Sequence, residues 1–122
     1  MDGLIFDTEN FFMEILGIEM DKKGYKLKRE NYIKLLGLNV PAVEKGMKEM
    51  YGEDYPFEEL SVLSREALGK KAREEGLPIK KGIRELLEFL KERDIKTAVA
   101  SSSPTVFVSE YLKCSGIYDL FD

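Results

Sequence analysis

The first nine residues, MDGLIFDTE, hold the most suggestive chemistry in the chain. Two acids, Asp2 and Asp7, enclose a glycine and a short apolar run. We interpret this stretch as the back part of a catalytic motif whose front part would precede Met1. The expectation is therefore an incomplete catalytic segment.

A second polar stretch, Ser101 to Ser103 followed by Pro104, is expected to form the turn before a helix. Hydroxyls and free backbone N–H groups at the positive end of a helix suit a phosphate or another oxyanion. Serine is also a preferred N-cap, so the plain alternative is that Ser102 or Ser103 only caps the helix. Taken alone, this stretch leaves both interpretations open.

Composition limits the other choices. The 122 residues are 43% hydrophobic and 34% charged, which is typical of a folded globular unit. The net charge of -4 argues against a nucleic-acid partner, because binding to phosphate backbones needs an excess of cations. The absence of histidine and the single cysteine, Cys114, exclude the usual zinc sites and Ser-His-Asp or Cys-His catalysis. No apolar run is long enough to span a bilayer, so we expect a cytoplasmic protein with no membrane partner.

Apolar residues at spacings of three and four predict helices along most of the chain. Four of them, separated by glycine stops, are expected over residues 9–24, 28–36, 40–51 and 56–76. Asn39 is the predicted N-cap of the third. We expect the four to form a small bundle.

The pattern changes after the segment LPIKKG, residues 77–82. A helix is predicted over residues 82–93, a strand buried on both faces over 94–100, and a helix over 105–116. Helix, strand, polar turn and helix is the order found in doubly wound α/β domains. Cys114 is expected on the buried side of the last helix. The other residues predicted to face inward on the two helices are Ile83, Leu86, Leu87, Leu90, Phe107, Val108, Tyr111 and Leu112.

Taken in order, MDGLIFDTE, a helical insertion, GIRELLEFLKERDIKTAVASSSP and GIYDLFD resemble the haloacid dehalogenase superfamily. The subgroup most similar to this chain contains sugar-phosphate phosphatases and β-phosphoglucomutases, whose helical cap follows the first motif. The resemblance implies an α/β fold. It places a partial Rossmann-like core over residues 1–8 and 77–122 and an inserted four-helix cap over residues 9–76, so that the chain is mostly helical.

The resemblance also implies roles for individual residues. In that family a leading aspartate forms an aspartyl-phosphate, and that residue would precede Met1. Asp2 would protonate the leaving oxygen and later accept a proton, and its backbone carbonyl would help to hold Mg²⁺. Gly3 would let the backbone approach the phosphate, while the Ser101 hydroxyl and the Ser102 amide would bind phosphoryl oxygens.

Two further sets of residues follow from the resemblance. Gly37, Leu38 and Asn39 fall where related caps select the substrate, with a glycine stop and a helix cap as the plain alternative. Asp7 and Thr8 are expected to brace the hinge between cap and core rather than to touch the substrate.

Three functions follow as expectations. The first is a Mg²⁺-dependent phosphatase acting on small phosphorylated metabolites, chiefly sugar phosphates, or a β-phosphoglucomutase-type phosphomutase, with these 122 residues incomplete and inactive alone. The second is an inactive short form that acts as an interaction module, pairing as a homodimer or by strand exchange because its sheet edges are uncovered. The third is an unrelated helical binding protein.

Overall fold

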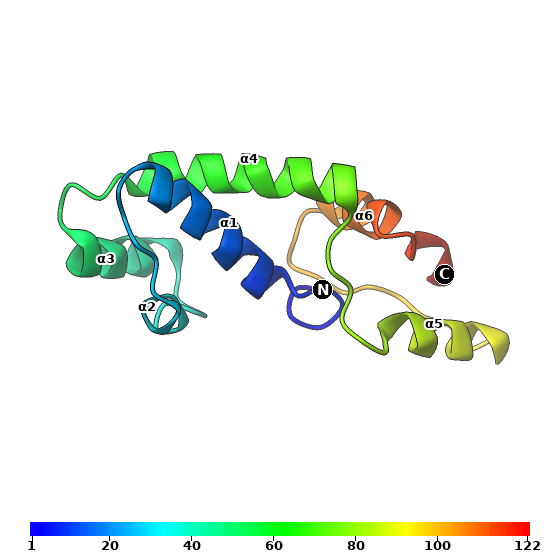
Figure 1. Cartoon of the computed structure of the whole chain (residues 1–122). Coiled ribbons are helices and arrows are strands. Elements are labelled where there is room, and N and C mark those ends of the chain that lie inside the picture. Colours follow the sequence, from blue (N-terminus) through cyan, green and yellow to red (C-terminus); the bar gives the residue numbers. More distant parts are fainter. The chain divides into compact units, whose positions relative to one another are not determined.

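A computed structural model describes all 122 residues (Figure 1). The chain divides into two compact units, one formed by Met1–Phe11 with Gly69–Asp122 and the other by Phe12–Leu68. The division inferred from the sequence, with the cap over residues 9–76 and the core over residues 1–8 and 77–122, stays a prediction. The regular elements are α1 (Thr8–Lys22), α2 (Arg29–Ile33), α3 (Val40–Tyr51), α4 (Phe57–Glu75), α5 (Ile83–Glu92), α6 (Thr105–Cys114) and the short 3-10 helix η1 (Tyr118–Leu120).

Helix α3 shows how local signals set the helix bounds. The Asn39 side-chain oxygen accepts the backbone N–H of Ala42 at 3.0 Å, which confirms the predicted N-cap. Pro41 lies in the first turn, where its missing N–H costs nothing. The helix ends at Gly52, whose φ of 105° is a backbone conformation that favours glycine.

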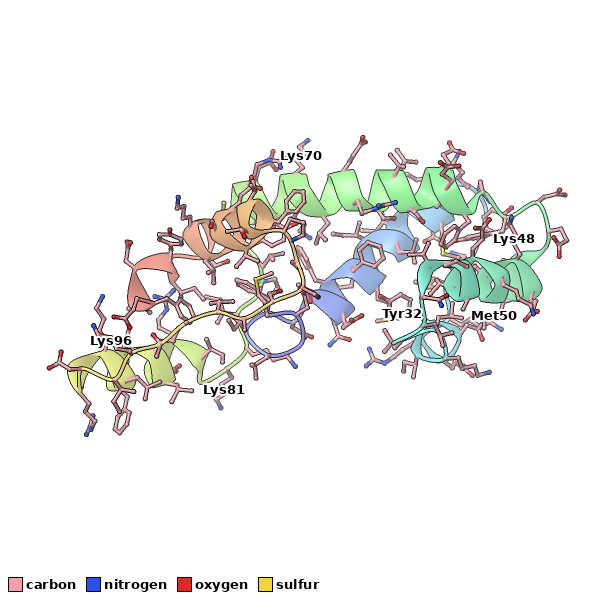
Figure 2. The ribbon with its side chains drawn as sticks, turned by 180° about the vertical axis from the view of Figure 1, so that it is seen from behind. Tyr32, Lys48, Met50, Lys70, Lys81 and Lys96 are labelled. Carbon is pink, nitrogen blue, oxygen red and sulfur yellow. The ribbon has the colours of Figure 1, made fainter.

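The unit Phe12–Leu68 has one core, to which all of its helices or their connecting turns contribute. Tyr32 from α2 and Met50 from α3 pack against that core (Figure 2). The rings of Tyr25 and Tyr55 meet edge to face, with centroids 5.2 Å apart. The buried residues of the cluster are Leu16, Met20, Leu35, Met47, Tyr55 and Leu60.

In the other unit, backbone hydrogen bonds tie the first residues to the link that follows α4. The Lys80 N–H donates to the carbonyl of Ile5 at 2.8 Å, and the Asp7 N–H donates to that of Pro78 at 3.0 Å. Phe6 lies between these two bonds and is fully buried. These backbone bonds therefore fix the amino-terminal loop that carries Asp2 and Asp7.

The strand predicted over residues 94–100 is not formed, and Figure 1 shows an extended link between α5 and α6 instead. A strand needs a ladder of backbone bonds to a neighbour. This segment pairs at one point, where the Asp122 N–H donates to the Thr97 carbonyl at 3.1 Å and the Thr97 N–H donates to the Asp122 carboxylate at 2.8 Å. Ile95 is 48% exposed and so is not buried as predicted. The regular structure is helical, and these residues show no Rossmann-like sheet.

Three side chains predicted to face inward are exposed. Leu86 on α5 is 51% exposed and Phe107 on α6 is 50% exposed. Cys114 is exposed as well, because Leu112, two residues earlier on the same helix, is the one that points inward. The helices themselves were predicted, but their buried faces are narrower than the sequence pattern indicates.

None of the six α-helices has the length and the apolar composition needed to cross a membrane.

Candidate active site

Asp2 is presented by a tight loop at the start of the chain. The carbonyl of Met1 accepts backbone N–H groups from within this loop, the closest from Ile5 at 2.9 Å. Gly3 has a φ of 73°, which favours glycine, and its N–H donates to the carbonyl of Phe6 at 3.0 Å. The Gly3 amide is thus engaged within the loop, and the side chain of Asp2 is exposed.

The three serines form a turn in front of α6. The Ser103 N–H donates to the hydroxyl oxygen of Ser101 at 3.2 Å, while Ser102 is exposed. The N-cap position of α6 is Pro104, and no side chain caps the helix. The plain alternative, in which Ser102 or Ser103 serves only as a helix cap, is therefore wrong.

The Asp2 loop and the serine turn meet at a single hydrogen bond. The Ser103 hydroxyl donates to Oδ2 of Asp2 at 3.4 Å, across 101 positions of sequence. Both residues belong to the same compact unit. The structure thus brings Asp2 to the serine turn through Ser103, whereas Ser101 faces the Ser103 amide.

Tyr111 adds a phenol to this neighbourhood. Burial raises the pKa of the Tyr111 hydroxyl, the negative charges of Glu110 and Asp2 raise it further, and the positive charge of Arg73 opposes them. Arg73 also forms an ion pair with Glu110 at 3.6 Å. Since its pKa lies above the ordinary value, Tyr111 carries its proton at neutral pH.

Sequence reasoning missed two residues near Asp2, for different reasons. Ser103 belongs to a turn that the sequence did single out, but the polar pattern did not distinguish its hydroxyl from that of Ser101. Tyr111 has the spacing of a core residue, and that spacing carries no signal for a carboxylate 109 positions earlier in the chain.

The side chains around Asp2 do not form a binding site for the Mg²⁺ that the resemblance implies. No group of three or more carboxylate, thiolate or imidazole side chains gathers anywhere in the structure. Mg²⁺ is held by oxygen ligands in near-octahedral geometry, usually with one or two carboxylates. Asp2 alone does not make such a site, so no chemical step is assigned to the ion.

The predicted hinge residues lie where the loop enters α1. The Asp7 carboxylate accepts two contacts from the Asn10 amide nitrogen, at 2.9 and 3.1 Å. Thr8 is the first residue of α1, and its hydroxyl is buried without a hydrogen-bond partner. Movement about this junction remains a prediction.

The predicted substrate-selecting residues lie in the unit Phe12–Leu68 and are all exposed. Gly37 has a φ of 78°, in the region that favours glycine, and Asn39 caps α3. Leu38, between them, is 49% exposed. The helix-cap role of Asn39 is confirmed, and the selection of substrate by this turn remains a prediction.

In the sequence, helices α1 to α5 separate the Asp2 loop from the serine turn that it contacts. Haloacid dehalogenase-like hydrolases match residues 1–122, and the chain belongs to this family. YhcW of Bacillus subtilis (strain 168), which carries a provisional assignment as a phosphatase, is 31% identical over 122 residues. The crystal structure of a protein from Thermotoga maritima, provisionally assigned as a β-phosphoglucomutase, superposes on the whole chain with a TM-score of 0.78 and 25% identity.

The chain spans about half the length of these relatives. It covers 54% of YhcW and 56% of the Thermotoga protein, while 99% and 100% of the chain itself is matched. The resemblance inferred from the motifs is therefore confirmed at the level of the family.

Proposed function

We propose that this protein is a phosphatase that hydrolyses phosphate monoesters of small metabolites, sugar phosphates above all. The observation that carries the proposal is the contact between Asp2 and the serine turn, which joins an acid to hydroxyl and amide donors of the kind that bind a phosphoryl group. Family membership and the similarity to YhcW support it.

The proposed reaction has two steps. A carboxylate, which the resemblance places two positions before Asp2, attacks phosphorus and breaks its bond to the ester oxygen, and Asp2 gives that oxygen a proton. Water then attacks the phosphorus of the aspartyl-phosphate and gives a proton to Asp2, while the bond between phosphorus and the carboxylate oxygen breaks, which frees the carboxylate and releases inorganic phosphate. Ser101 and Ser102 would hold the phosphoryl oxygens in both steps. The proposed Mg²⁺ requirement rests on the family alone, and bound Mg²⁺ would offset charge repulsion between carboxylate and phosphate.

The experiment measures phosphate release from p-nitrophenyl phosphate, with Mg²⁺ and with EDTA. It uses the gene product in full, including any residues encoded on either side of these 122. We expect activity with Mg²⁺ that falls by about a hundredfold or more in Asp2→Asn, the range for a lost general acid. Asp54→Asn, which changes an exposed carboxylate in the other unit, is the control. An inactive wild type, or full activity in Asp2→Asn, contradicts the proposal and favours an inactive module.

A phosphomutase is the second candidate, favoured by the superposition on the Thermotoga protein. A mutase passes the phosphoryl group to a sugar hydroxyl instead of water. The two reactions differ in product, because only the phosphatase releases inorganic phosphate. ³¹P NMR of the reaction with a hexose phosphate distinguishes them.

A further inference from the structure

We propose that Ser103 is a positioning residue that orients the carboxylate of Asp2 for proton transfer. The inference rests on the proposed function, since it concerns the proton that Asp2 would carry. It differs from the role of the serine turn in holding phosphate, which concerns Ser101 and Ser102.

The backbone conformation of Ser103 is restricted in the absence of substrate. Its N–H is bound by the Ser101 hydroxyl at 3.2 Å. The residue that follows is Pro104, and a residue before proline is restricted to extended conformations. Ser103 is also half-buried, whereas Ser101 and Ser102 are exposed. Its hydroxyl is therefore carried on the most constrained part of the turn.

The side chain of Asp2 is less restricted than that of Ser103. Asp2 is exposed, on a loop held by backbone bonds, and its carboxylate contacts the Ser103 hydroxyl through Oδ2 at 3.4 Å. An exposed carboxylate without a partner rotates freely between staggered conformers. A hydroxyl that holds Oδ2 selects among those conformers and leaves Oδ1 free for the substrate oxygen.

The length of the contact suits a catalytic group before substrate binds. A distance of 3.4 Å is long for an O–H···O bond, whose usual value is about 2.7–2.8 Å. Catalytic hydrogen bonds are often long in unliganded enzymes and shorten in the substrate complex. Loss of orientation near the reacting atoms can lower a rate by up to about a hundredfold.

The test compares Ser103→Ala, Ser103→Thr and the matched control Ser109→Ala in the full gene product, with p-nitrophenyl phosphate and Mg²⁺. Ser109 is half-buried on α6 and takes no part in the site. We expect Ser103→Ala to lower kcat about tenfold with KM changed by less than about twofold, because the contact orients Asp2 rather than binds substrate. Ser103→Thr keeps the hydroxyl and should restore most of kcat. An unchanged kcat in Ser103→Ala, or no rescue by threonine, overturns the inference.

A second measurement does not depend on activity. NMR three-bond couplings between Hα and Hβ of Asp2 report whether its side chain holds one conformer. We expect one dominant conformer in the wild type and in Ser103→Thr, and averaged couplings in Ser103→Ala. Identical couplings in all three overturn the inference even if the enzyme is active. If the protein has no phosphatase activity and the couplings are averaged only in Ser103→Ala, the contact is supported, but the proposed function and the role of Ser103 in positioning Asp2 for proton transfer are both rejected.

Discussion

Ser64 in α4 is fully buried, and its hydroxyl has no hydrogen-bond partner. A buried hydroxyl without a partner costs about 1–3 kcal/mol of desolvation. Alanine removes that oxygen, fits the same space and has a higher helix propensity. We expect Ser64→Ala to raise the free energy of unfolding by about 1 kcal/mol, measured by urea denaturation at constant m-value.

Ser61→Ala provides the matched control for this prediction. Ser61 lies one turn earlier on the same helix and is only half-buried. Its replacement by alanine raises helix propensity but removes no desolvation cost of a fully buried hydroxyl. Ser64→Ala should therefore stabilise more than Ser61→Ala. A destabilised Ser64→Ala would mean that the hydroxyl is bonded in solution and that the prediction is wrong.

Single residues of the site were predictable to different degrees. Asn39 was identifiable because an N-cap depends on a side chain and an amide three residues apart. Asp2 and the serine turn were identified through the resemblance to a family. The pairing of Asp2 with Ser103 was not predictable, because it depends on the direction of one hydroxyl across 101 positions of sequence.

At the scale of elements, the approach of α3 to the turn after α2 depends on Gly46. A Cβ atom built on Gly46 would lie 2.4 Å from Cδ2 of Leu35, which is itself buried in the core cluster. Alanine would gain about 1 kcal/mol of helix propensity but would force Leu35 out of place, at a typical overpacking cost of about 1–3 kcal/mol. We expect Gly46→Ala to destabilise the protein by about 1 kcal/mol in urea denaturation.

A double-mutant cycle tests the cause of that loss. Leu35→Val removes the Cδ atoms, so the cost of Gly46→Ala should fall by at least about 0.5 kcal/mol in its presence. Gly69→Ala in α4 is the control, because the atoms nearest to its Cβ would belong to the flexible tip of the Arg73 side chain, the first at 3.4 Å. We expect Gly69→Ala to be neutral or stabilising. Additive effects of Gly46→Ala and Leu35→Val would show that the clash does not account for the loss.

The elements themselves divide into those that local sequence determines and those that it does not. Helix α3 covers the predicted residues 40–51, because its hydrogen bonds and its capping signals all lie within the segment. The strand predicted over residues 94–100 depends on neighbouring strands that these 122 residues do not supply, so its apolar pattern leads only to an extended link. The apolar pattern of residues 94–100 therefore indicated a buried segment but did not identify the neighbouring elements that would bury it.

For the molecule as a whole, three apolar side chains are exposed where the sequence pattern predicts burial. Leu86 on α5 and Phe107 on α6 each have about half of their surface exposed, and Ile95 between the two helices is exposed to a similar extent. All three lie in the unit formed by Met1–Phe11 and Gly69–Asp122. Burying a whole leucine or phenylalanine side chain contributes about 1.5–3 kcal/mol, so burial of the exposed half contributes about half of that and favours association.

We propose that the 122-residue chain, produced alone, pairs with a second copy of itself through these side chains. Light scattering after size exclusion should give about twice the monomer mass at micromolar concentration. Leu86→Lys and Phe107→Lys should each weaken the dimer by about tenfold or more, since each substitution removes the half-exposed surface from both copies, about 1.5–3 kcal/mol in all against the 1.4 kcal/mol that a tenfold change requires. Val62→Lys, which places the same charge at an exposed valine of α4 in the other unit, should leave the mass unchanged. A folded monomer at every concentration, with circular dichroism typical of helices, would show that these surfaces are tolerated in water and that the chain needs no second copy.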